Sequence, residues 1–469
     1  MSGISPSAHL DQNGLFFKAL GINPFINPFP NSVDVGLLQV SGNPTDITGG
    51  VVVDSILAGT TKITASAVGN LYMVGSGGNF YNKDLSNENA PTNLRSGGST
   101  ITTPANGLEI FRPNTTAANT EFLYYWQTTQ IGRWDLTSSH PSGWVDNQFT
   151  GLESTTYHPT HFFQGDVYYG NKSFIGKIYS NEGVATNNLI ALDFPADFIT
   201  TCLSDDGTYL IAGISKDLGS LTLQGTTKVV FWDTISLSPT KEWVIPDFGI
   251  NALKRFGNGH LAFCGRGLWY FSFDTKPTKI RTLGTSNSIA YGYPNAVDIL
   301  NDAALWGGDA LVASFGKFAP EASNAYLEPI KLPSGTVIFV NSSARVNRVY
   351  IGTTEPKFYT HTLSDGGGTT TTFPETVYLD LGDEVNITRM DILLGEPLAT
   401  GDRFTLRTQT DEDNSASDYG SLSFDTDGAK RKIKLFKELK ANQLKLLFNF
   451  ETGNVKIKAI KGYGYSNPY

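Results

Sequence analysis

The chain has 469 residues, of which 40% are hydrophobic and 12% aromatic, whereas only 17% are charged. Its 49 Gly and many Thr, Ser and Asn residues indicate short strands joined by turns. They exclude a helical bundle, which would be rich in Ala, Glu, Lys and Leu. The formal net charge of −9 argues against binding of duplex DNA over the whole surface.

The first residues show neither a basic start nor an apolar signal segment, and no run of about 18 apolar residues occurs. We therefore expect a protein that is made in a cytoplasm and has no membrane span. Cys202 and Cys264 both lie in apolar, strand-like runs. Two cysteines give no disulfide framework, so we expect two buried free thiols.

Residues 1–50 are rich in Asn, Pro, Gly and Phe, most densely over 23–31. Prolines at this density prevent a helix and remove the donors that a strand needs for pairing. We therefore predict an extended N-terminal arm. Its side chains Phe25 and Phe29 would dock on another surface, of this chain or of a neighbouring subunit. The alternative is a disordered terminus.

Residues 51–370 contain a loose repeat, in which an aromatic or apolar strand is followed by Asp and a polar turn. The repeated aspartates are Asp84, Asp135, Asp193, Asp233 and Asp274. Hairpin signals lie upstream, such as Asp206-Gly207 and Asn258-Gly259. Because the aspartates follow the repeat, we expect them to cap turns rather than to act in catalysis.

The spacing of this repeat is close to the roughly 40–50 residues of a four-stranded propeller blade. We predict an all-β fold with a β-propeller of about seven blades over 51–370. Six or eight blades are alternatives, and a β-solenoid is the competing architecture. The predicted blades cover residues 51–97, 107–153, 158–197, 198–248, 249–288, 293–335 and 336–370.

After a Gly- and Thr-rich linker at 365–373, apolar and polar residues alternate, for example over 404–407 and 455–460. Alternation with a period of two predicts strands with one buried face, so we assign 374–469 to a C-terminal β-sandwich. Residues 430–461 carry nine Lys and one Arg against two Glu, whereas 402–427 is acidic.

This charge pattern predicts a basic docking face for an acidic partner surface, either a neighbouring subunit or nucleic acid. The alternative is that the lysines only cover solvent-facing sides and strand edges, which discourages aggregation. The candidate docking residues are Lys430, Arg431, Lys432, Lys434, Lys456, Lys458 and Lys461.

Signatures of catalysis are sparse, because the chain has no phosphate-binding loop and no nucleophile elbow. His158 and His161 flank a Pro-Thr pair, and we expect surface or loop histidines rather than metal ligands. The acidic segment 411–415 lacks the glycine and closing glutamate of a calcium loop, so we expect a solvated loop. We predict that the protein is not an enzyme and has no catalytic, cofactor-binding or metal-binding residue.

Two further kinds of site are considered. A propeller axis could gather carboxylates for glycoside hydrolysis, but the turn at 204–207 lacks the spacing and the Trp of sialidase turns. Exposed tryptophans could stack on sugars. Most of them fit strand positions and are expected in the core.

The outline of arm, Gly/Thr/Asn-rich propeller and C-terminal sandwich with the aromatic tail 463–469 resembles virion proteins of tailed bacteriophages, particularly tail-associated propeller proteins. The stretches 384–392 and 454–460 are similar to the C-terminal sandwich of those proteins. The resemblance implies a structural virion component that is present in several copies of a symmetric assembly. It would dock on other virion proteins through its arm and sandwich. A receptor- or glycan-binding propeller and, further, a propeller glycoside hydrolase are the alternatives.

Overall fold

The computed structural model of the chain describes residues 9–11, 14–16, 44–48, 54–62, 69–95, 99–117, 120–216, 227–265, 267–283, 288–290, 292–300, 302–317, 330–343, 348–362, 379–394, 397–410, 412–452, 455 and 457–466. Strands dominate these ranges, and the one helix within them is the single turn α1 (Phe424–Asp427). No helix in these parts of the chain is long and apolar enough to cross a membrane.

Five four-stranded antiparallel sheets follow one another along the chain, each with its strands paired in chain order. The first two contain β4 (Ile56–Lys62), β5 (Asn70–Gly75), β6 (Phe80–Asp84) and β7 (Thr92–Asn93), then β8 (Pro104–Phe111), β9 (Phe122–Gln127), β10 (Gln130–Trp134) and β11 (Trp144–Thr150). The next two contain β12 (Thr160–Phe163), β13 (Asp166–Asn171), β14 (Phe174–Asn181) and β15 (Val184–Asp193), then β16 (Phe198–Asp205), β17 (Leu210–Lys216), β18 (Thr227–Trp232) and β19 (Lys241–Ile245). The fifth contains β20 (Ile250–Phe256), β21 (Gly259–Cys264), β22 (Gly267–Phe271) and β23 (Thr278–Thr282).

A seven-stranded sheet follows, and the N-terminal strand β3 forms one of its edges. Its members are β24 (Val297–Leu300), β25 (Asp302–Gly307), β26 (Asp309–Lys317), β27 (Ile330–Ser343), β28 (Arg348–Thr353), β29 (Phe358–Thr362) and β3 (Thr45–Asp46). The long strand β27 pairs with β26 through residues up to Thr336 and with β28 from Val337 onward. One strand thus joins two groups of strands.

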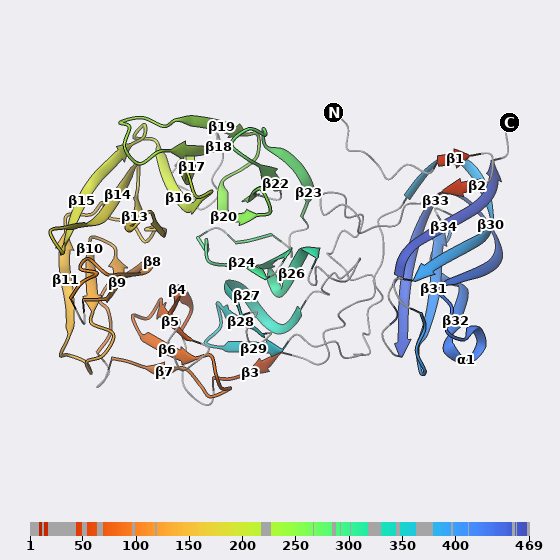
Figure 1. Ribbon diagram of the computed structural model, residues 1–469, viewed down its shortest axis with the longest axis horizontal. Helices are drawn as coiled ribbons and strands as arrows, with labels where there is room; N and C mark the ends of the chain where they lie inside the picture. Colours follow the sequence, from red (N-terminus) through yellow and green to blue (C-terminus); the bar gives the residue numbers. More distant parts are fainter. Residues whose placement is uncertain are drawn as a thin grey trace.

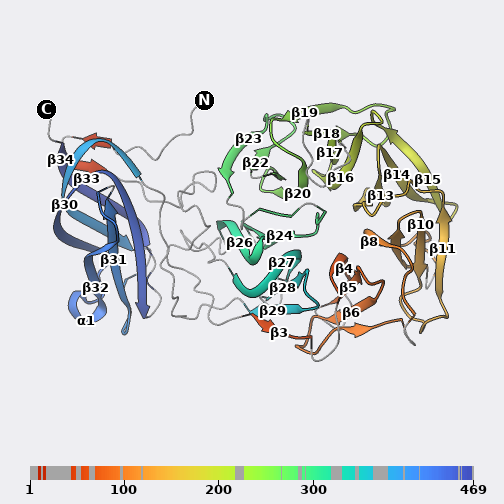
Figure 2. The same cartoon turned by 180° about the vertical axis from the view of Figure 1, so that it is seen from behind.

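The sheets are arranged in a ring, with β7, β11, β15 and β19 on its rim (Figures 1 and 2). The first strands of successive sheets contact one another, from β4 through β8, β12, β16 and β20 to β24, and β24 contacts β27 of its own sheet. The ring closes where β27 contacts β4. This arrangement is a β-propeller, and the predicted all-β propeller fold is confirmed.

The N-terminal segment contributes to both ends of the molecule. In β3, Asp46 lies opposite Tyr359, and the backbone N–H of Ile47 donates to the carbonyl of Phe358 at 3.0 Å. Ile47 itself is buried against Ile56 and Phe358. Upstream, β1 (His9–Asp11) and β2 (Gly14–Phe16) form a hairpin, and β2 lies against β34 of the C-terminal domain (Figure 1).

Three of the five repeated aspartates cap turns, as predicted: Asp84, Asp135 and Asp233. In the turn that contains Asp274, the backbone N–H of Thr275 donates to the hydroxyl of Ser272 instead. Asp135 accepts hydrogen bonds from the backbone N–H groups of Thr137 and Ser138, at 3.0 and 2.7 Å. Asp233 accepts the equivalent pair in the sheet β16–β19. Both follow the third strand of their sheets, whereas Asp193 ends the fourth strand, β15.

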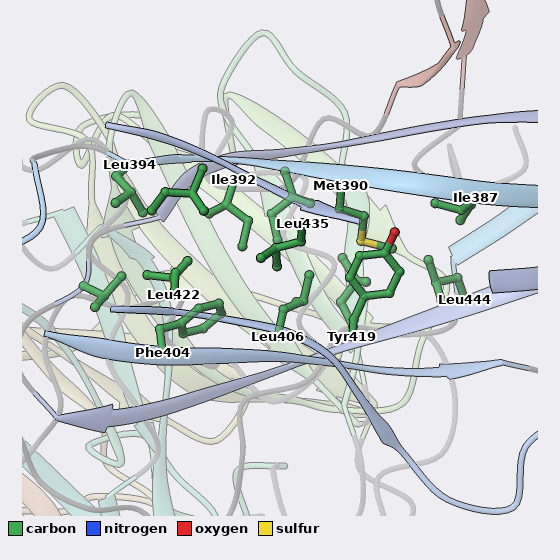
Figure 3. Packing of buried hydrophobic residues seen from close by; sticks show 14 of the residues in the cluster. Ile387, Met390, Ile392, Leu394, Phe404, Leu406, Tyr419, Leu422, Leu435 and Leu444 are labelled. Atoms are coloured by element: carbon green, nitrogen blue, oxygen red, sulfur yellow. The ribbon is translucent and has the colours of Figure 1, made fainter. Parts of the chain in front are cut away.

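The C-terminal strands form a five-stranded antiparallel sheet in the order β32-β31-β33-β30-β34. Their bounds are β30 (Leu379–Leu394), β31 (Arg403–Thr410), β32 (Ser417–Ser423), β33 (Lys432–Thr452) and β34 (Ile457–Ser466). Figure 3 shows buried side chains of β30, such as Met390 and Ile392, facing Leu406 of β31 and Leu422 of β32. This core contains only residues from 385 to 460 and is separate from the cores of the ring.

Candidate functional site

The basic segment that the sequence singles out forms a free strand edge. Residues Lys432–Ala441 of β33 pair with β30 on one side, whereas β31 pairs only with the second part of β33, from Leu444 onward. No described strand pairs with the other side of Lys432–Ala441. We call residues 430–440 the basic edge, in which Lys430, Arg431, Lys432 and Lys434 are exposed.

One of these cations is held by a buried acid. The Nζ atom of Lys432 lies 2.8 Å from Oδ2 of Asp391, and Nε of Arg389 lies 2.9 Å from Oδ1. Asp391 is completely buried, and both contacts have ion-pair distances but lack hydrogen-bond geometry. The Asp391 carboxylate raises the pKa of Lys432. Arg389 also stacks on the ring of Tyr463 at 3.9 Å.

The structure describes the side chains of some of the other predicted docking residues, only the backbone of others, and nothing of the rest. Lys430, Arg431 and Lys434 make no ion pair with any residue in the described ranges. Lys458 and Lys461 lie in β34, where only their backbone is described, and Lys461 is in register with Asp391. The remaining three lie outside the described residues: Phe25, Phe29 and Lys456.

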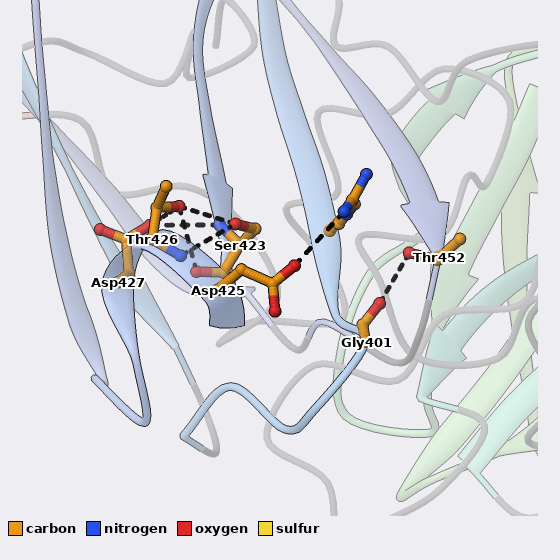
Figure 4. Close-up of polar contacts among 7 residues, drawn as sticks. Gly401, Ser423, Asp425, Thr426, Asp427 and Thr452 are labelled. Carbon is orange, nitrogen blue, oxygen red and sulfur yellow. Dashed lines mark hydrogen bonds and ion pairs between the residues drawn. The ribbon is translucent and has the colours of Figure 1, made fainter.

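An acidic edge lies at the margin of the same domain, because β32 pairs only with β31. The side chains of Asp418 and Asp425 are 70% and 64% exposed, and they face Arg407 and Arg403 at 2.9 and 3.3 Å. Figure 4 shows the turn α1, which Ser423 caps and in which Asp425 and Asp427 lie. The acidic edge consists of Glu412, Asp413, Asp418, Asp425 and Asp427. The exposure of Glu412 and Asp413 agrees with the predicted solvated loop.

The basic and acidic edges are neighbours. The hydroxyl of Tyr419 in β32 donates to the backbone carbonyl of Lys437 in β33 at 2.8 Å. The Nζ atom of Lys437 donates back to the carbonyl of Asp418. The side chain of Leu435 packs directly over Gly420. Two free edges of opposite charge therefore lie on one side of the C-terminal domain.

A second polar cluster surrounds the propeller axis. The sequence analysis named one member, His161, as an expected surface or loop histidine and did not predict that it joins a cluster. Nε2 of His161 lies 2.7 Å from Oδ2 of Asp205, and Nζ of Lys254 lies 3.3 Å from Oδ1 of Asp298. Asp298 also accepts hydrogen bonds from the backbone N–H and the hydroxyl of Ser342, at 2.7 and 2.8 Å. The first two contacts join the first strands of neighbouring sheets, and the contact with Ser342 joins β24 to β27. The axial cluster comprises Glu109, His161, Asp205, Lys254 and Asp298.

Glu109 is the unusual member of the axial cluster. Burial raises the pKa of its carboxyl group to about 7, although His161, Lys254 and a hydrogen bond with Thr60 oppose this effect. A carboxyl group with this pKa can donate or accept a proton near neutral pH. Glu109, His161, Lys254 and Asp298 are each the third residue from the end of a first strand. Aligning the strand ends of the repeat would have found them.

The prediction of surface or loop histidines is wrong for His158, which is completely buried. Its Nδ1 atom lies 2.8 Å from the carbonyl oxygen of Gly170 and its Nε2 atom 3.3 Å from that of Thr128. Burial lowers the pKa of His158. The ring lies between neighbouring sheets, and the two carbonyl groups oppose the effect of burial because they favour the charged imidazolium.

The predicted free thiols and core tryptophans are confirmed. Cys202 and Cys264 are buried and unpaired, and burial raises the pKa of Cys202 to about 12. Among the tryptophans, Trp126, Trp134 and Trp232 are buried in the ring. They are not available to stack on a sugar.

The fold defines a β-propeller protein with an additional C-terminal β-domain. No protein-family model matches the sequence, and no curated protein does. A solved structure that is similar is the β-propeller domain of Cps50 (Swd1) from Myceliophteria thermophila, with 11% identity and a TM-score of 0.45 over 65% of this chain and 96% of that one. The computationally designed protein Ika8 is similar with 12% identity and a TM-score of 0.40 over 70% of this chain and 100% of that one. Likeness at this level carries no argument about function.

Proposed function

We propose that this chain is a non-enzymatic structural component of the virion of a tailed bacteriophage, associated with the tail. The observation that carries the proposal is the side of the C-terminal domain on which the basic and acidic edges meet. Free strand edges are templates for pairing with another chain. Phe436, at 71% exposure, lies within the basic edge. It is the most exposed large apolar side chain in the described part of the C-terminal domain, and it would be removed from water by a partner that covers the edge.

The proposed architecture is a rigid ring of seven blades and a sandwich. In this interpretation the seven-stranded sheet counts as two blades, which share β27, and β3 completes the second of them. The C-terminal sheet counts as two layers, which share β33. A ring fastened by strand pairing loses little conformational freedom when it docks, so more of the interaction free energy remains as affinity.

The test is to purify particles from a culture that carries the source genome and to identify their proteins by mass spectrometry. The chain should be present in a fixed copy number per particle, and antibodies against it should label the tail. The proposal fails if the chain is expressed but absent from washed particles. Variants of the edges should lower incorporation without changing the amount of folded protein.

A receptor- or glycan-binding propeller is the alternative. The ligand would bind near the propeller axis rather than on the tryptophans, which are mostly buried. Phe162 is 48% exposed in the first strand β12, next to His161. An exposed aromatic ring on an inner strand of the ring suits stacking on a sugar. Binding on a glycan array that Phe162→Ala abolishes would favour this function. Glycan cleavage that Glu109→Gln abolishes would favour a hydrolase.

A further inference from the structure

We propose that two copies of this chain pair about a two-fold axis, with the basic edge of each copy against the acidic edge of the other. This inference rests on the proposed structural function and names the partner that the C-terminal domain fits, which is a second copy of the same domain.

The first step concerns the backbone. Lys432–Ala441 of β33 and the strand β32 each have one side without a partner strand in the described part of the chain. The backbone N–H and C=O groups on such a side can pair with another strand. Two free edges on one molecule allow two pairing contacts between two molecules.

The second step concerns charge. Lys430, Arg431 and Lys434 are exposed cations without an ion pair among the described residues, and Glu412 is an exposed carboxylate at the acidic edge. A surface of one sign would repel a copy of itself. Here both signs lie on one side of the domain, held together by the hydrogen bond between Tyr419 and Lys437.

The third step concerns symmetry. A two-fold interface places one surface against the same surface of its copy. When a basic and an acidic edge lie next to each other, the two-fold rotation brings each onto the edge of opposite charge. The same contact forms twice, so the attraction is doubled and the assembly closes at two copies. A head-to-tail arrangement would use each edge once and would continue to larger species.

Phe436 adds an apolar contribution. It is 71% exposed and lies in register with Arg389, on the opposite face of β33 from the buried Leu435. Removal of its apolar surface from water would stabilise the interface. If the lysines only prevented the strand edge from pairing with another chain, an exposed aromatic side chain among them would work against that role.

The experiment measures the mass of the full chain by analytical ultracentrifugation at low salt. Wild type should form a dimer that weakens as salt is raised. The double variants Lys430→Glu/Lys434→Glu and Glu412→Lys/Asp425→Lys should each dissociate at least about tenfold more readily, because the substituted edge loses most of its net charge and attracts the opposite edge only weakly. Mixed in equal amounts, the two variants should form a one-to-one heterodimer in preference to either homodimer, since one of its two contacts then joins an unsubstituted basic edge to an unsubstituted acidic edge.

The control is Lys172→Glu/Lys276→Glu, which makes the same change in net charge as Lys430→Glu/Lys434→Glu but on the propeller, and it should remain dimeric. Circular dichroism confirms that each variant is folded. The proposal is overturned by a wild-type monomer at all concentrations, by species that grow beyond two copies, or by variants that dimerise as wild type does. Dimers that never enter particles would contradict the virion function alone, whereas monomers that enter particles would contradict the pairing alone.

Discussion

At the scale of single residues, Glu109 makes the stability of the folded protein depend on pH. Its pKa of about 7 lies above the ordinary value of 4.5, so the folded protein resists ionisation of this carboxyl group. Below about pH 4.5 the group is neutral in both states. As pH rises from there to about 7, the unfolded state loses its proton first and the folded state becomes less stable. Above about pH 7 the carboxyl group is ionised in both states, and the loss of folding stability stays at its full size.

Glu109→Gln should therefore raise the free energy of unfolding at pH 8 by about 2–3 kcal/mol and change it little at pH 4. Denaturant unfolding followed by tryptophan fluorescence measures this, because all seven tryptophans lie in the ring, between Trp126 and Trp306. Glu182→Gln, at an exposed turn, is the control. An equal effect of Glu109→Gln at both pH values would show that burial does not disfavour the charged form.

At the scale of elements, the two-residue strand β3 fastens the ring. Ile47, next to β3, fills a core formed by Ile56, Tyr350 and Phe358. Ile47→Ala should lower the free energy of unfolding of the ring by about 2–4 kcal/mol, because it leaves a cavity at the closure. Thr45→Ala is the control, since the Thr45 side chain is exposed. If β3 does not close the ring, the two substitutions will have equally small effects.

At the scale of the whole molecule, the ring and the C-terminal domain have separate cores. Leu406→Ala, in the C-terminal core, should lower the stability of that domain by about 2–5 kcal/mol and leave the tryptophan transition of the ring in place. Leu261→Ala, in a ring core, should do the reverse. Circular dichroism follows both parts and tryptophan fluorescence follows only the ring. Equal shifts in both signals would mean that the contact of β2 with β34 makes the parts unfold together.

The sequence by itself determined the strand class, the hairpins and the capped turns, because these depend on residues close together in the chain. Asp135 caps its turn through the N–H groups two and three residues ahead. Gly207 and Gly257 adopt positive φ angles of 90° and 57° at hairpins that join first and second strands. Such geometry is encoded by residue type within a few positions.

Only the tertiary structure decided which distant residues meet. Asp46 reaches Tyr359 across the closure, although a strand as short as β3 has no pattern to predict it. The axial cluster gathers one residue from each of five first strands, and burial raises the pKa of Glu109 there. The lysines of 430–440 were visible as a charge run. That they form a free edge beside an acidic one depends on which strands pair, and strand pairing is a non-local property.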